Sequence, residues 1–130
     1  MATIPDNPFS SGAGYANGEF VPVAEARIPI TDLGFIRSDA TYDVVHVWKG
    51  RFFRLEDHVE RFLSSCHKLR FKLPLDRAGL IAMLHRLVAL TGLDDVYVNF
   101  SATRGSLPPG SRNPLDCQNG IYGFAIPFMW

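Results

Sequence analysis

The sequence lacks an excess of charge of either sign. Its 130 residues contain 13 Lys plus Arg and 13 Asp plus Glu, so the formal net charge is zero. Nucleic-acid-binding proteins normally carry a basic excess, and membrane-surface anchors carry a polybasic run. The charge balance therefore argues against both kinds of partner. A hydrophobic content of 47% with 20% charged residues excludes a disordered chain and predicts one globular domain.

Long apolar runs, targeting signals and metal-binding motifs are also missing. No apolar run is long enough to span a bilayer, and the N-terminal MATIPDNPFSSG does not resemble a secretory signal. The sequence contains no HExxH, CxxC or GxSxG motif, and we expect His58 and His67 to face solvent from a helix. Cysteine is scarce, and Cys66 and Cys117 are expected to be free thiols in a reducing compartment. These features predict a soluble cytoplasmic protein without a metal site.

The first part of the chain predicts an arm followed by a hairpin. Residues 1–13 are rich in Pro, Ser, Gly and Asn, and we expect them to form a flexible arm before one small domain over residues 14–130. The pair Asn17-Gly18 is a strong turn signal, because both central positions of a type I′ turn need positive φ. It predicts a hairpin over Gly14–Val23. Lys49-Gly50 predicts a second tight turn, with Arg51–Leu55 as the returning strand.

Hydrophobic periodicity predicts the remaining elements. Alternation of apolar and polar residues indicates strands over Thr41–Trp48 and Val96–Thr103, and a final apolar strand is expected over Ile121–Trp130. Apolar residues spaced by three and four predict a helix from Leu55 to Pro74. They also predict a second helix, which Asp76 caps and Thr91-Gly92 closes. The order of strands, two helices and strands predicts an α+β domain in two layers. Its sheet is expected to be mostly antiparallel, with both helices packed on one side.

Several polar residues in these elements are candidates for binding. Arg61 lies on the helix side away from the apolar stripe, and its guanidinium suits an anionic group such as phosphate. Tyr42 shares a strand face with Val44, and Tyr97 and Asn99 form a similar pair on a second strand. These patterns alone favour a solvated surface residue for Arg61 and ordinary half-buried strand residues for the tyrosines.

A long stretch rich in Pro and Gly, RGSLPPGSRNPLDCQN over residues 104–119, shows no periodicity. Loops of this length inside a compact domain are usually functional or disordered. The stretch contains Arg104 and Arg112. Their side chains are either surface charges of a mobile loop or part of a binding site.

The stretch from Arg37 to Leu69, RSDATYDVVHVWKGRFFRLEDHVERFLSSCHKL, resembles the N-terminal domain of fold-type-IV, pyridoxal-phosphate-dependent aminotransferases. Within it, SDATYDVVHVWKGRFFRLEDH is especially similar to the (R)-selective amine transaminases. The later VYVNFSATRG and IYGFAIPFMW also resemble that family, so the likeness extends over residues 14–130. It implies transfer of an amino group from an (R)-amine or D-amino acid to a keto acid, with pyridoxal 5'-phosphate as cofactor, in a homodimer.

The resemblance also assigns roles to individual residues. Arg61 matches the arginine that binds the cofactor phosphate, and Tyr42 matches the tyrosine that lines the substrate side of the cofactor. Val44 matches a position in the small substrate pocket, and Tyr97 matches an aromatic pocket position. Asn99 departs from the family pattern, because some (R)-amine enzymes have Glu there.

Two arginines complete the predicted substrate site. Arg37 lies in a segment where the (R)-amine enzymes have His, which is a second departure from their pattern. The stretch over residues 104–119 resembles a loop that closes over the active site and can supply an arginine for a substrate carboxylate. Arg112 is the candidate for that role.

The lysine that forms the Schiff base with the cofactor is not among these matches. Lys49, Lys68 and Lys72 do not fall on its position. In the family that lysine belongs to a C-terminal domain, so we expect this chain to be the N-terminal domain of a longer transaminase and to be inactive alone. Two alternatives stay open: a D-amino acid or branched-chain aminotransferase, and a non-catalytic binding or dimerisation module.

Overall fold

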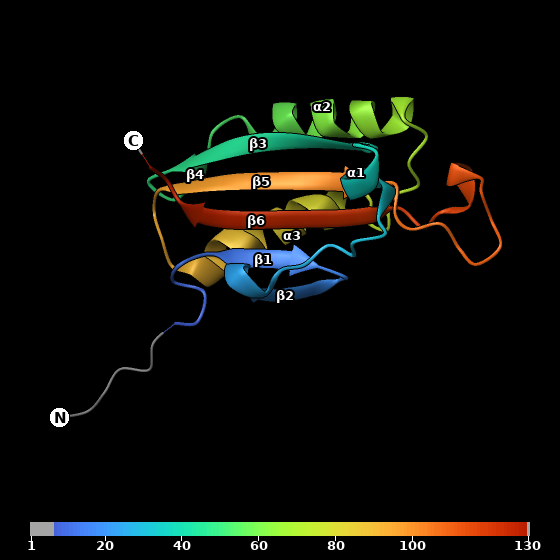
Figure 1. The fold of residues 1–130 in the computed structure, drawn as a ribbon. Coiled ribbons are helices and arrows are strands. Elements are labelled where there is room, and N and C mark those ends of the chain that lie inside the picture. Colours follow the sequence, from blue (N-terminus) through green and yellow to red (C-terminus); the bar gives the residue numbers. More distant parts are fainter. Residues whose placement is uncertain (1–6, 130) are drawn as a thin grey trace.

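The computed structural model describes residues 7–129, which form a six-stranded sheet with two long helices (Figure 1). The strand order is β2-β1-β6-β5-β3-β4, and every neighbouring pair is antiparallel. The strands are β1 (Ala13–Ala16), β2 (Glu19–Pro22), β3 (Ala40–Trp48), β4 (Arg51–Phe52), β5 (Val96–Thr103) and β6 (Gly120–Pro127). The helices are α1 (Leu33–Ile36), α2 (Leu55–Lys68) and α3 (Arg77–Thr91), with 3-10 turns at Val23–Glu25 and Pro114–Asp116. The predicted α+β class is confirmed.

Both long helices pack on the same face of the sheet, as predicted. In Figure 1, α2 runs along β3 and α3 lies behind the sheet. The alternation of β3 and β5 turns Val45, Val98 and Phe100 toward the helices, where each is at most 1% exposed. The ring of Phe62 on α2 meets that of Phe100 at a centroid distance of 4.8 Å. Burial of each such side chain contributes roughly 1.5–3 kcal/mol, so this apolar layer holds the helices on the sheet.

The predicted turns are confirmed by the backbone. Asn17 and Gly18 have φ values of 54° and 78°, and the turn that they form joins β1 to β2. Lys49 and Gly50 repeat this geometry, with φ values of 50° and 78°, between β3 and β4. Positive φ at both central positions gives the twist that a two-residue hairpin needs.

The predicted end of the first helix at Pro74 is wrong, because α2 ends at Lys68. Arg70 adopts a left-handed conformation with φ of 61°, and its N–H donates to the His67 carbonyl. This reversal brings Phe71 back into the core, where it is 8% exposed, and its N–H donates to the Cys66 carbonyl. The stripe that continues to Leu73 therefore belongs to a packed connection rather than to the helix.

The second helix matches its predicted caps. The Asp76 side chain accepts a hydrogen bond from the Gly79 N–H at 2.7 Å, as an N-cap does. Gly92 ends the helix with φ of 67°, in the left-handed conformation that glycine adopts without strain.

The two ends of the domain differ in detail from the prediction. The final strand ends at Pro127, whose partner Val96 is the first residue of β5, and beyond it the Phe128 N–H donates to the Asp95 carbonyl at 3.1 Å. Trp130 and residues 1–6 of the predicted arm lie outside the described residues. Within that arm, residues 7–12 form turns and Ala13 begins β1. No helix in the described part of the chain is both long and apolar enough to cross a membrane.

Candidate functional site

The sheet face opposite the two helices carries four of the predicted pocket residues. Tyr42 and Val44 project there from β3, and Tyr97 and Asn99 from β5, because their neighbours along each strand point into the core. Val44 lies directly opposite Asn99 in the ladder. Phe124 of β6 lies on the other side of Asn99 in register, and its ring stacks with Tyr97 at 6.1 Å. The strands thus bring together aliphatic, aromatic and amide side chains on one surface.

A cleft of about 470 Å³ lies where β3 meets α2, and it joins this surface to the helix. The described residues that line it are Tyr42, Asp43, Val44, Arg61 and Ser65. The cleft exists because β4 is short: it pairs with β3 only at Val47 and Trp48, which leaves the preceding edge of β3 beside α2. Three residues predicted separately from the sequence, Tyr42, Val44 and Arg61, therefore share one cleft.

Asp43 organises the polar side of this cleft. Its carboxylate accepts two hydrogen bonds from Arg61, from Nε to Oδ2 at 2.8 Å and from Nη2 to Oδ1 at 2.9 Å. His58 Nδ1 lies 2.9 Å from Oδ1, and the Val44 N–H donates to the same oxygen at 2.9 Å. The Asp43 side chain is 3% exposed, whereas that of Arg61 is 69% exposed. The buried acid thus holds an arginine whose outer side faces solvent.

The titration of Asp43 reflects these contacts. Burial acts to raise its pKa, but the hydrogen bonds from the two α2 side chains and the backbone outweigh burial. The pKa of Asp43 therefore lies below its ordinary value of 3.8, and the group is a carboxylate at neutral pH. The hydrogen bond to this carboxylate and its charge raise the pKa of the Arg61 guanidinium.

This arrangement fits the phosphate of a cofactor such as pyridoxal phosphate. The guanidinium of Arg61 has five N–H donors, and its contacts with Asp43 use one on Nε and one on Nη2. The remaining donors belong to an exposed side chain that lines the cleft together with Tyr42 and Ser65, two residues that carry hydroxyl groups. Guanidinium donors form strong charge-assisted hydrogen bonds with phosphate oxygens.

Arg37 and Arg112 are not among the residues that line this cleft. Arg37 is an exposed residue that ends α1. Arg112 is exposed in the loop over residues 104–119, just before the 3-10 turn at Pro114–Asp116. Their roles in substrate binding stay predictions.

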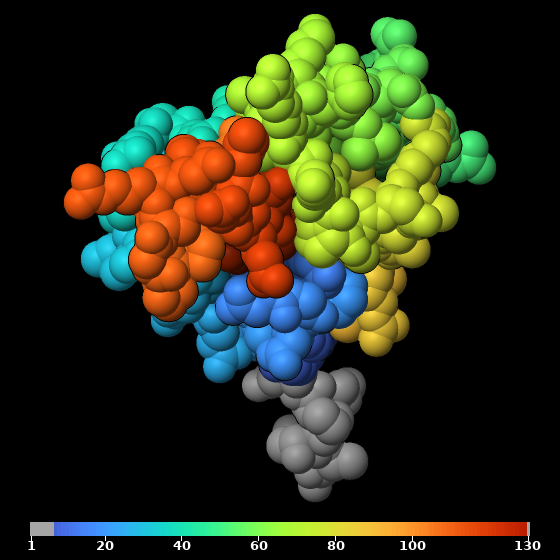
Figure 2. Space-filling model, turned by 90° about the vertical axis from the view of Figure 1, so that its right-hand side faces the viewer, coloured from blue at the N-terminus to red at the C-terminus, as the bar shows by residue number. Residues whose placement is uncertain are grey.

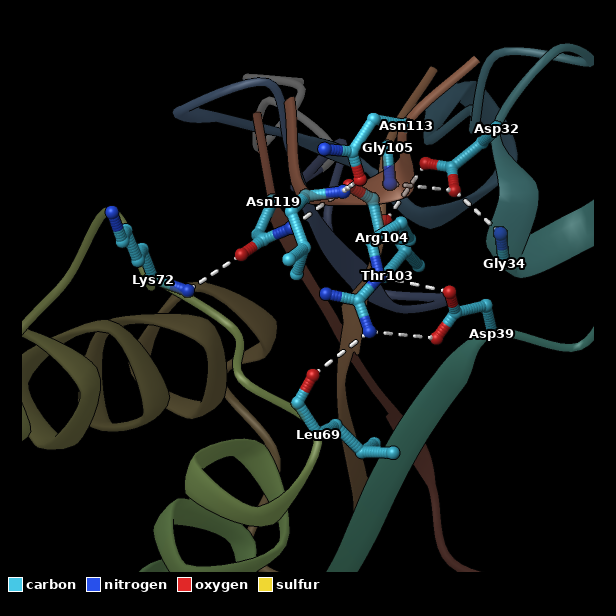
Figure 3. Close-up of polar contacts among 11 residues, drawn as sticks. Asp32, Gly34, Asp39, Leu69, Lys72, Thr103, Arg104, Gly105, Asn113 and Asn119 are labelled. Atoms are coloured by element: carbon cyan, nitrogen blue, oxygen red, sulfur yellow. Dashed lines mark hydrogen bonds and ion pairs between the residues drawn. The ribbon is translucent and has the colours of Figure 1, made fainter. Parts of the chain in front are cut away.

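The base of that loop is held by a buried arginine, so Arg104 is not the surface charge that the sequence left open. Its side chain is 8% exposed and donates to the Asp39 carboxylate, from Nε at 2.8 Å and from Nη2 at 3.2 Å. Nη2 also donates to the Leu69 carbonyl at 2.8 Å, as Figure 3 shows. The guanidinium lies 4.4 Å from the centroid of the Phe71 ring. Arg104 thus ties β5 to β3 and to the connection after α2.

Asp32, a second buried acid, holds the start of the same loop (Figure 3). Its carboxylate accepts from Thr103 Oγ1 at 2.7 Å and from the N–H groups of Gly34 and Gly105 at 2.7 and 3.1 Å. A cavity of about 790 Å³ lies between this loop and the β1–β2 hairpin. Figure 2 shows the loop in orange beside the hairpin in blue.

Sequence reasoning missed the residues that hold the predicted ones. Asp43 is an acid on the buried face of an alternating strand, which signals a partner of opposite charge. His58 was expected to face solvent, but its side chain is 23% exposed and contacts Asp43. The spacing of His58 and Arg61 by three residues on one helix, opposite a buried acid, is the signal that could have found this cluster.

The fold and the cleft define an α+β domain in which a buried acid holds an exposed arginine, and comparisons with known proteins give its family. Residues 40–130 match the family model of amino-transferase class IV. The match covers more than half of the chain, and the chain belongs to this family.

Two curated relatives illustrate the range of this family. The D-alanine aminotransferase of Staphylococcus aureus strain N315 is 32% identical over 91 residues, which are 70% of this chain and 32% of the relative. The branched-chain-amino-acid aminotransferase described as putative in Methanocaldococcus jannaschii is 28% identical over 114 residues, or 87% of this chain and 39% of the relative. The chain thus spans about a third of the length of such relatives.

Solved structures show the same fold. The branched-chain amino acid aminotransferase of Escherichia coli has a TM-score of 0.81 at 16% identity, over 91% of this chain and 41% of that chain. The branched-chain amino acid aminotransferase of Thermobaculum terrenum, solved in its PLP form, has a TM-score of 0.71 at 21% identity, over 91% and 40% of the two chains.

Proposed function

We propose that this chain is the phosphate-anchoring and substrate-pocket domain of a pyridoxal-phosphate-dependent transaminase. The enzyme would transfer an amino group from an (R)-amine to a keto acid. The observation that carries the proposal is the shared cleft of Tyr42, Val44 and Arg61 in a domain of the class IV family. The proposal includes a C-terminal domain that supplies the lysine, and a homodimer of the joined chains.

The residues of this chain have separate tasks in the proposal. Arg61 binds the cofactor phosphate, and Tyr42 lies beside the cofactor on the substrate side. Val44, Asn99 and Tyr97 shape the pocket on the open sheet face, where a small side chain beside two larger ones limits the size of the substrate. When bound, pyridoxal phosphate supplies the electron sink that lets the substrate carbon lose its proton.

A D-amino acid is the second candidate for the amino donor. The names of the Staphylococcus relatives favour it, because they are D-alanine aminotransferases. A D-amino acid carries a carboxylate, and Arg112 is the residue of this chain proposed to bind it when the loop over residues 104–119 closes. A branched-chain L-amino acid is a third donor, which the name of the Methanocaldococcus relative favours.

Substrate profiling of the protein joined to its lysine-bearing domain tests the donor. We expect turnover of (R)-1-phenylethylamine with pyruvate and much slower turnover of the (S)-amine. Preference for D-alanine or L-leucine would select one of the other donors. Absence of turnover with every donor, in protein that retains cofactor, would favour a non-catalytic binding or dimerisation module. The 130-residue chain by itself is expected to show none.

Cofactor affinity tests the role of Arg61. Replacement of Arg61 by Ala should weaken binding of pyridoxal phosphate by about tenfold or more, because hydrogen bonds between charged groups are lost. Binding of pyridoxal, which has no phosphate, should not change. Equal pyridoxal phosphate affinity in the variant and the wild type would refute the phosphate assignment.

A further inference from the structure

Asp43 is buried at a place where a carboxylate is costly. Its side chain is 3% exposed, on the strand face that also buries Val45 and Val47. A carboxylate in such surroundings is tolerated when donors or cations compensate the loss of water. Here the compensating side chains come from one turn of α2, His58 and Arg61. Asp43 is therefore the point at which polar contacts join β3 to α2.

The contact between Asp43 and Arg61 fixes the orientation of the guanidinium as well as balancing the charge of the carboxylate. Two hydrogen bonds to the two carboxylate oxygens, at 2.8 and 2.9 Å, define the plane of the guanidinium. An exposed arginine without such a partner loses considerable side-chain entropy when it binds a ligand. Arg54, the residue before α2, contacts Asp57 through Nε, and both side chains are largely exposed, at 67% and 63%. Arg61 differs from it because its partner is buried and rigid.

We infer that Asp43 is a positioning residue for the phosphate anchor. It holds the guanidinium of Arg61 so that the donors left over line the cleft beside Tyr42 and Ser65. Oδ1 also accepts from His58 and the Val44 N–H, which fixes the carboxylate itself. Asp43 thereby pre-orients Arg61 before the anion arrives, and lowers the entropy lost on binding. This inference rests on the proposed role of Arg61 as the phosphate ligand.

The test compares two ligands that differ in the phosphate. Apo protein joined to its lysine-bearing domain is titrated with pyridoxal phosphate and with pyridoxal, followed by absorbance. The measured quantity is the ratio of the affinity for pyridoxal phosphate to the affinity for pyridoxal. Asp43→Asn should lower the ratio by about tenfold, because the neutral amide no longer fixes the guanidinium. Asp43→Glu, which keeps the charge, should restore part of the loss. An unchanged ratio in Asp43→Asn, or an equal loss for both ligands, would overturn the inference.

Two further variants separate the possible failures. Asp39 forms a similar two-point pair with Arg104, and this pair lies outside the cleft. Asp39→Asn breaks it and should leave the ratio unchanged. A fall in the ratio there as large as that in Asp43→Asn would show a general effect of destabilisation and overturn the inference. Arg61→Gln tests the proposed function separately: if it leaves the ratio unchanged, the phosphate role of Arg61 fails. If Arg61→Gln lowers the ratio and Asp43→Asn does not, only the positioning role fails.

A measurement on the wild-type protein guards against variants that do not fold. The Nε–H of Arg61 gives its own signal in ¹⁵N NMR and should be protected from solvent exchange by Asp43. Titration with inorganic phosphate should shift the Arg61 Nη signals while Nε–H keeps its protection. If phosphate instead releases Nε–H to solvent, Asp43 competes with the anion and does not position Arg61.

Discussion

Arg104 provides the sharpest test of how this domain holds its long loop. The substitution is Arg104→Met, which keeps much of the aliphatic volume and removes the guanidinium. Three hydrogen bonds are lost, two to the Asp39 carboxylate and one to the Leu69 carbonyl, together with the contact over Phe71. The Asp39 side chain, which is 26% exposed, then keeps its charge without a partner.

The expected loss of stability follows from this geometry. Breaking a buried ion pair by removal of one partner costs about 3–5 kcal/mol, and the partial exposure of Asp39 places the expected value near the lower limit. A loss of about 3 kcal/mol in a domain of this size lowers the midpoint of thermal unfolding by about 10 °C. Hydrogen exchange at Gly105, the next residue in the loop, should also become faster.

Thermal and urea unfolding followed by circular dichroism measure this change. The matched control is Arg54→Met, which breaks the exposed pair with Asp57 and should cost less than about 1 kcal/mol. If Arg104→Met unfolds at the wild-type midpoint, or if the control loses as much, then burial of the pair does not stabilise the loop base and the reasoning is refuted.

Three further predictions concern the backbone at Gly105, the thiol of Cys66 and the carboxyl group of Asp43. Gly105→Ala should destabilise by about 2 kcal/mol or more in urea unfolding, because Gly105 has φ of 90° and an added Cβ would overlap the Gln118 carbonyl oxygen; wild-type stability would contradict this. Burial raises the pKa of the Cys66 thiol to about 11, so iodoacetamide at about pH 8 should leave it unmodified until the protein unfolds; rapid alkylation of the native protein, detected by mass spectrometry, would disprove it. The pKa of Asp43 is lower in the folded than in the unfolded chain, so its contribution to stability is present above pH 3.8 and is lost as the pH falls through the folded value. Asp43→Asn should therefore flatten the pH dependence of the unfolding free energy below about pH 4, and an unchanged slope would count against it.

Much of the fold could be predicted because local rules act without competition. The strand Val96–Thr103 was predicted with its observed bounds, since its alternation matches a sheet covered on one face. The Asp76 cap and the Asn17-Gly18 turn depend on one or two residues, and both were found. The end of α2 was not, because apolar spacing continues after Lys68 and the left-handed Arg70 leaves no mark in the pattern. Tertiary packing of Phe71 decides that boundary.

The candidate site was predictable residue by residue but not as a cluster. Periodicity places Tyr42 and Val44 on one strand face, and resemblance assigns Arg61, yet neither shows that they line one cleft. That follows from the shortness of β4 and the packing of α2 beside β3, which are properties of the whole sheet. The partner of Arg61 was missed for the same reason, since Asp43 is distant in sequence.

The proposed anchoring of an anion by Arg61 would account for a buried acid at this place in the domain. An arginine on the exposed side of a helix, 69% accessible, has no packing to orient it, and a binding site built on it would be loose. A carboxylate from the adjacent strand supplies a rigid support, because the strand is held by pairing with β5 along its length. Asp43 also lines the cleft, but its side chain is only 3% exposed and both of its oxygens accept hydrogen bonds from the protein, which limits its repulsion of an anionic ligand. In the proposed site, the burial of Asp43 and the exposure of Arg61 are therefore two requirements: the first would fix the cation, and the second would leave it open to the anion.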